Sequence, residues 1–147
     1  MLDKARIRRP KTYESLMTKL CKGDHAVFDT YADLLIFAAV LGQNRGESAS
    51  FSQSAEPVAL TIFGGQFDKT VMNTLAVAAC DNDPDIMSDQ NVEAKIKIFE
   101  EYANGGLNIL DTNLKNVPDD DIQATMVNLI LRTVKKNKIL GDITGLA

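Results

Sequence analysis

The feature that most constrains the fold is an apolar stripe that continues through two adjacent glycines, Gly105 and Gly106. Its members recur every three or four residues: Val92, Ile96, Phe99, Ala103, Gly106 or Leu107, Leu110 and Leu114. This is the period of one helix face, and a turn would normally shift its phase. We therefore predict one long helix, although each glycine costs about 1 kcal/mol relative to alanine. A close helix–helix crossing at Gly106 would offset that cost; a bend or short turn that keeps the phase is the alternative.

Four other stretches also have helical character. Residues 12–22 carry a clean amphipathic stripe that ends at Gly23. The stretch 25–43 follows Asp24, a residue type that caps helices, and its second half is apolar on almost every side, which is typical of a central helix. The remaining two are 69–80, with Asp68 as the expected cap, and about 118–137, which opens with Pro118 and three aspartates.

One segment favours a β-strand. The hexapeptide 58–63, VALTIF, is rich in β-branched and aromatic residues and follows a polar loop over 42–57. A single strand needs a partner, and Arg6-Ile7-Arg8 is the only other segment with weak alternation. The expected fold class is mainly α: a single compact helical domain of about five helices with one short strand or a minimal two-stranded β element.

Charge is distributed unevenly along the 147 residues. Residues 1–22 hold seven Lys and Arg against two acids, whereas residues 23–131 hold five against seventeen. We expect a basic N-terminal arm over 1–11 and a single helical domain over 12–147. Arm cations can contact phosphates or an acidic partner, and the candidates are Arg6, Arg8, Arg9 and Lys11. The alternative is a frayed, solvated terminus. The cations of the last helix, Arg132, Lys135, Lys136 and Lys138, are more simply explained by the helix dipole.

No complete catalytic or metal-binding set stands out. The one histidine, His25, and the two cysteines, Cys21 and Cys80, fall short of the four ligands of a closed zinc site. The acidic turn 81–89 starts like a calcium loop but has Ile86 where glycine is needed. Both Gly-Gly pairs lack the Lys-Ser/Thr of a phosphate-binding loop. We expect no metal and no cofactor.

One pattern points to an enzyme. Pro84-Asp85 followed by Glu93-Ala94-Lys95 is similar to the signature of metal-dependent nucleases, in which the acids hold magnesium and the lysine positions water. That signature needs its second half on a strand. Here Glu93 and Lys95 lie in a stretch with helical period and composition, so a nuclease is kept only as a second alternative.

The chain shows no sign of export or membrane insertion. Its longest apolar run, 34–41, is shorter than the roughly 18 residues that span a bilayer. The N-terminus has charge but no apolar core of a signal peptide. We expect a cytoplasmic protein with reduced thiols.

Four segments together resemble a bacterial family of small proteins. They are RIRRPKTYESL, VFDTYADLLIFAAVLG, EPVALTIF and KIKIFEEYANGGLNIL, within about residues 6–114, and EEYANGGL is the most distinctive. The family is the DNA phosphorothioation-associated (Dnd system-associated) protein 4 family. No catalytic motif defines it, so the resemblance assigns no residue a role. It implies a genetic context: DNA sulfur modification and linked restriction of foreign DNA.

The resemblance and the residues lead to one main hypothesis. We expect a non-enzymatic accessory protein of a phosphorothioation-linked restriction-modification (antiviral defence) system, acting through protein contacts, DNA contacts or both. Gly105 and Gly106 are then packing or interface residues. The alternative is a DNA-binding regulator or targeting subunit that uses the arm. A homo-oligomer is left open, as is the identity of the partner.

Overall fold

A computed structural model describes residues 6–63, 66–80 and 91–132. Contacts within the chain divide it into two units, 1–112 and 113–147, each described here by itself. The fold is mainly helical with a two-stranded antiparallel sheet, which confirms the expected class. The division into an arm (1–11) and a domain (12–147) stays a prediction, although residues 6–11 belong to the first unit.

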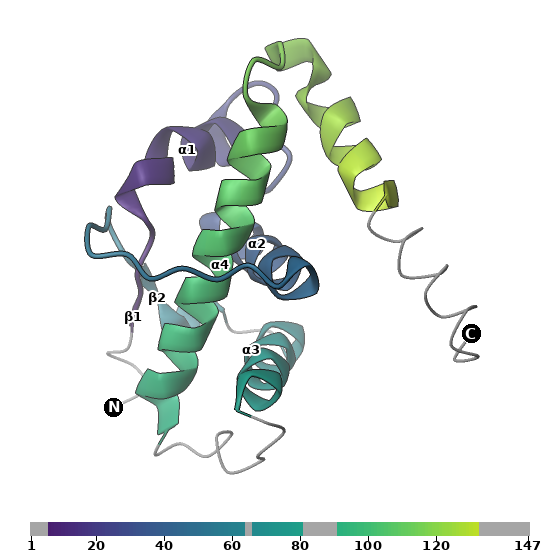
Figure 1. Cartoon of the computed structure of the whole chain (residues 1–147). Coiled ribbons are helices and arrows are strands. Elements are labelled where there is room, and N and C mark those ends of the chain that lie inside the picture. The colour runs from purple at the N-terminus through teal and green to yellow at the C-terminus, as the bar shows by residue number, and fades with distance from the viewer. Residues whose placement is uncertain (1–5, 64–65, 81–90, 133–147) are drawn as a thin grey trace, which may run out of the picture. The chain divides into compact units, whose positions relative to one another are not determined.

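The first unit contains most of the regular elements (Figure 1). In chain order these are β1 (Arg6–Ile7), η2 (Lys11–Tyr13), α1 (Glu14–Lys22), α2 (Tyr31–Arg45), β2 (Val58–Ala59), η3 (Leu60–Ile62), α3 (Gln66–Ala79) and α4 (Val92–Leu114). Helix α2 contacts both α1 and α3. It buries most of its length, as expected for a central helix.

Two predicted helix starts were wrong. Helix α2 begins at Tyr31 rather than at residue 25, because the Thr30 hydroxyl oxygen accepts a hydrogen bond from the Asp33 N–H (3.1 Å) and caps it. Thr30 followed by an acid three residues later is a capping-box pattern, and this signal could have located the start. Helix α3 begins at Gln66, so Asp68 lies inside the helix and is not its cap.

The strand prediction was right in its partner and wrong in its length. Only Val58 and Ala59 are extended, and the rest of the hexapeptide turns into η3. Strand β1 pairs antiparallel with β2, with Arg6 opposite Ala59 and Ile7 opposite Val58. The arm segment therefore supplies the expected partner strand.

The arm continues past β1 along the preceding loop. Pro10 forms an isolated bridge with Ser54, so two arm residues face the three residues 55–57. The loop side therefore carries one residue more than the arm between the two paired positions, and such an extra residue is a β-bulge. Proline at position 57 lacks an N–H and cannot complete the ladder, which accounts for the interruption at this point.

The core of the first unit is largely aliphatic and includes a buried pair of aromatic rings. Phe63 and Phe99 meet edge to face with ring centroids 5.7 Å apart. Ile7 of the arm has no exposed surface, so β1 is anchored by an apolar side chain as well as by pairing. The other fully buried large side chains here are Met17, Leu20, Leu34, Leu35, Leu107 and Leu110.

The second unit contains the end of the described chain. Asn116 has a left-handed backbone (φ 66°) just after α4, where asparagine is tolerated better than most residues. Then η6 (Asp119–Asp121) leads into a helix that is described from 122 to 132. A helix in this region was predicted. The cations at 135, 136 and 138 and the acidic turn 81–89 lie outside the described residues.

Candidate functional site

Helix α4 is continuous through its two glycines, as the apolar period predicted. Glycine at 106 allows the backbone of α2 to touch it. A Cβ there would overlap the carbonyl group of Ala38 and lie 2.8 Å from the Ala38 Cα. Gly42 is the reciprocal position on α2, because a Cβ there would overlap the Tyr102 carbonyl oxygen and lie 3.0 Å from the Gly106 nitrogen. The two helices thus cross backbone to backbone.

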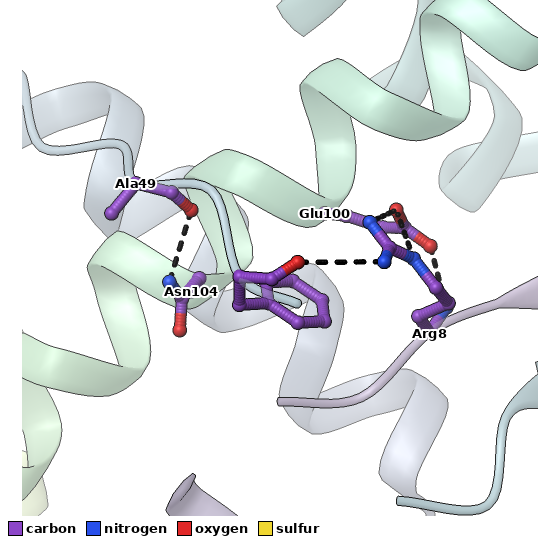
Figure 2. A network of polar contacts seen from close by, with 5 residues as sticks. Arg8, Ala49, Glu100 and Asn104 are labelled. Atoms are coloured by element: carbon purple, nitrogen blue, oxygen red, sulfur yellow. Dashed lines mark hydrogen bonds and ion pairs between the residues drawn. The ribbon is translucent and has the colours of Figure 1, made fainter. Parts of the chain in front are cut away.

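Gly105 admits a different segment, the loop that follows α2. A Cβ at 105 would overlap the Glu47 carbonyl and lie 3.0 Å from the Ser48 nitrogen. Next along the loop, the Ala49 N–H donates to the Glu101 carbonyl (3.1 Å), and the Asn104 amide donates to the Ala49 carbonyl (2.9 Å; Figure 2). Helix α4 therefore binds both backbone polar groups of Ala49, its N–H and its carbonyl, and so holds the loop in place.

Glu100, one residue before this contact, holds the arm. Its Oε2 accepts from the Arg8 backbone N–H at 2.6 Å, and its Oε1 accepts from Arg8 Nε (3.1 Å) and Nη2 (3.0 Å; Figure 2). The Glu100 side chain is 4% exposed and that of Arg8 is 44% exposed. The Arg8 guanidinium also lies 4.7 Å from the Phe51 ring centroid. Arg8 thus joins the arm to both α4 and the loop.

Arg9 makes a different set of contacts from Arg8. Its Nε donates to the Glu56 carbonyl (2.7 Å), and its guanidinium lies 4.2 Å from the Tyr31 ring centroid. The residue is 4% exposed, and its Nη1 has no hydrogen-bond partner among the described residues. A buried guanidinium with one unpartnered nitrogen is under-compensated, because burial removes the water that would otherwise bind it.

We call this assembly the clasp: the arm (6–11), the loop (46–56) and the part of α4 over 100–106. All six residues singled out from the sequence lie in it, and four of them make its contacts, namely Arg8, Arg9, Gly105 and Gly106. Arg6 and Lys11 are in the arm but are exposed. The assignment of all six residues to partner binding or interface packing stays a prediction. Sequence reasoning missed Glu100, because nothing in the helical pattern distinguishes it from Glu101.

A shallow hollow of about 370 Å³ opens beside the clasp. It is lined by polar groups from the loop and α4, together with Tyr13. The Tyr13 hydroxyl donates to Asn108 Oδ1 (3.0 Å). Burial, and secondly the Asp111 carboxylate, raise the pKa of Tyr13, so the phenol stays neutral and remains a donor.

Cys21 lies near Arg9 and is expected to be unreactive. Burial raises the pKa of its thiol to about 11, the Asp33 carboxylate adds to the rise, and Arg9 and Lys22 oppose it. The Cys21 thiol also donates to the Thr30 carbonyl at 3.5 Å. Against an ordinary value of 9.0, the thiolate fraction at pH 8 falls about 100-fold.

We therefore expect iodoacetamide to alkylate Cys21 in the native protein about 100-fold more slowly than in the urea-unfolded chain at pH 8. Because the unfolded thiol ionises first, the stability contributed by the neutral thiol is present below pH 9 and is lost toward pH 11. Site-resolved mass spectrometry of the labelled peptide measures the rate. Equal labelling of native and unfolded chains would contradict the burial argument.

The nuclease pattern is not assembled as that chemistry requires. Glu93 and Lys95 lie in the first turn of α4, not on a strand, and Lys95 Nζ donates to Asn73 Oδ1 (3.2 Å). Asp85 lies outside the described residues. Within the described ranges, no group of three or more His, Cys, Asp or Glu side chains could hold a metal ion.

The fold and clasp define a small, mainly helical protein whose arm is fastened to α4, the longest of the described helices. The family model of DNA sulphur modification system-associated protein 4 matches residues 6–142. The chain belongs to this family. No curated protein and no solved structure matches the chain.

The same structure bears on membrane association. In the part of the chain that is described, every helix is either too short or too polar to cross a bilayer.

Proposed function

We propose that this chain is a non-enzymatic, cytoplasmic accessory protein of a DNA sulphur-modification system and its linked restriction functions. It acts by contact with a protein component of that system. Family membership supports the association with the system. The distinctive segment EEYANGGL supports the contact role. Its polar groups and glycines contact the arm, the loop and α2, and none of these contacts is catalytic in kind.

The hollow beside the clasp is the surface we propose for this contact. Asn104 and Asn108 line it from α4, and Glu47 and Ser48 line it from the loop. Glu47 brings a carboxylate, and there is no cation among the described residues that line the hollow. α2 ends here, and the carbonyl end of a helix carries partial negative charge. These features favour a neutral or basic protein segment over a phosphate backbone.

The experiment is a pull-down of the tagged full chain from its native host, with and without nuclease treatment, followed by mass spectrometry. We expect proteins of the sulphur-modification or restriction system to be recovered after nuclease treatment. Asn108→Arg should reduce that recovery several-fold, because it places a large cation in the hollow. Recovery of no system protein under either condition would rule the proposal out.

A matched control lies on the same helix. Ala94 is exposed on α4, and fourteen residues separate it from Asn108, which is about 21 Å along a helix. Ala94→Arg adds the same charge away from the hollow and should leave recovery unchanged. Equal losses from both variants would point to a general charge effect and would contradict the hollow as the contact surface.

The arm supports a second candidate function, a DNA-binding regulator or targeting subunit. Arg6 and Lys11 are exposed at its two ends. If system proteins are recovered only without nuclease treatment, the result would support this second candidate over contact with a protein.

A further inference from the structure

The Arg8–Glu100 contact has the form of an occupied anion site. Three donors of one residue converge on one carboxylate: the backbone N–H at 2.6 Å, Nη2 at 3.0 Å and Nε at 3.1 Å. A guanidinium fork with a backbone N–H recognises carboxylate and phosphate by the same geometry. Arg8 is 44% exposed, so the fork can be reached from solvent. Glu100 therefore fills a place that suits a phosphate.

Arg9 is poorly compensated in the docked state, in which the arm lies against the loop and α4. Arg9 is 4% exposed, and its Nη1 finds no acceptor among the described residues. Among the described residues, its guanidinium contacts the Glu56 carbonyl and the Tyr31 ring and forms no ion pair with a carboxylate. Burying a cation in this way disfavours the docked state, and release of the arm would relieve that cost.

The pairing of the arm is also short at this point. Arg8 and Arg9 face the bulge at 55–57, between the two-residue strand β1 and the isolated Pro10–Ser54 bridge. The Arg8 N–H bonds to Glu100 instead of to the neighbouring strand. The ladder resumes at Arg9, because the Arg9 carbonyl oxygen accepts from the Ala55 N–H (2.9 Å) and the Lys11 N–H donates to the Gln53 carbonyl oxygen (3.0 Å). Exchange of Glu100 for another anion at Arg8 leaves these two bonds in place, whereas freeing Arg9 breaks them.

The spacing of the arm cations suits a nucleic-acid strand. Arg6 and Arg8 are two residues apart on an extended segment, so they share a face at about 6.6 Å separation. Each phosphate step of one DNA strand rises about 3.4 Å along the axis, and the two phosphates lie farther apart than this rise because the strand winds round the axis. The two cations can therefore meet neighbouring phosphates of one strand. Lys11 adds an exposed cation farther along the arm.

We propose that the arm is a DNA-backbone-binding segment held closed by Glu100, which occupies the place of a phosphate. DNA binding exchanges Glu100 for a phosphate at Arg8 and frees Arg9 to contact a second one. The choice of DNA rests on the family's association with DNA sulphur modification. The test uses purified protein, so it fails independently of the pull-down for a protein partner.

The first test compares two neighbouring carboxylates. Glu100→Gln and Glu101→Gln remove the same charge from adjacent residues of α4, but Glu100 alone binds the arm through its side chain. We expect Glu100→Gln to bind a fluorescent DNA duplex at low salt at least about fivefold more tightly than Glu101→Gln, as for a modest internal coupling. Trypsin should also cleave after Arg8 faster in Glu100→Gln. Equal affinities of two folded variants overturn the inference.

A disulfide that locks the arm provides a test if Glu100→Gln does not fold. Arg6 and Ala59 are opposite residues of an antiparallel pair, a separation that a disulfide spans. Arg6→Cys with Ala59→Cys, in a background with Cys21 and Cys80 changed to alanine, should bind DNA about fivefold more weakly when oxidised than when reduced. Equal binding in both redox states, or no DNA binding at low salt by either form, overturns the inference.

Discussion

Gly106→Ala is expected to destabilise the first unit by about 3 kcal/mol or more, although alanine is the better helix former by about 1 kcal/mol. The added Cβ would overlap the Ala38 carbonyl group, and backbone atoms of a packed helix have no rotamer through which to move aside. The two helices would have to separate. For a chain of this size we expect the melting temperature to fall by roughly 10 °C. Thermal unfolding followed by circular dichroism at 222 nm measures the change.

Gly23→Ala is the control for this prediction. A Cβ at position 23 would lie 3.4 Å from the Lys19 carbonyl oxygen, an ordinary contact, and the backbone there is extended (φ −84°). Its stability should change by no more than about 0.5 kcal/mol. If Gly106→Ala melts with the wild type, α2 and α4 do not cross as closely as described.

The second large effect is expected from Arg8→Ala. Truncation leaves the Glu100 carboxylate, which is 4% exposed, without its guanidinium. Removing one partner of a buried ion pair costs about 3–5 kcal/mol. Because Arg8 is 44% exposed and water screens the pair, we expect a smaller loss of about 2 kcal/mol in the free energy of unfolding. Urea unfolding of the variant and the wild type gives this difference.

A double-mutant cycle separates the buried charge from the lost packing of Arg8. The double variant Arg8→Ala with Glu100→Gln contains no buried carboxylate at this position, so it should recover about 1 kcal/mol relative to Arg8→Ala alone. Strict additivity of the two single changes would show that the ion pair contributes no coupling energy. The Phe51 contact of Arg8 would then account for the whole effect.

Much of the helical architecture could be predicted from the sequence because it depends on neighbours three and four residues apart. The apolar period from Val92 to Leu114 carried the correct inference that Gly105 and Gly106 lie inside one helix. The start of α2 was predicted six residues too early, since Asp24 also suits a cap and the apolar side chains between it and Thr30 extend the pattern. The hexapeptide 58–63 became mostly a 3-10 turn, because only two of its residues find a paired strand.

Only some residues of the candidate site could be predicted from the sequence. The arm cations and the glycine pair could be picked out by composition and spacing, whereas Glu100 could not be distinguished from its neighbour. The structure gives Arg8 an acidic partner 92 positions away, whereas Arg9 Nη1 has no hydrogen-bond partner among the described residues. It also shows that the glycines serve two contacts, α2 at Gly106 and the loop at Gly105.

The sequence by itself determined that the chain is mainly helical, that the helix of the apolar stripe continues through Gly105 and Gly106, and that basic charge gathers in the N-terminal arm and over 132–138. These properties follow from local spacing and composition. Only the tertiary structure decided that this arm is fastened to α4 and that α2 and α4 touch through their backbones. The physical reason is that both contacts join residues far apart along the chain, and only packing brings such residues within reach of a hydrogen bond or a bare Cα.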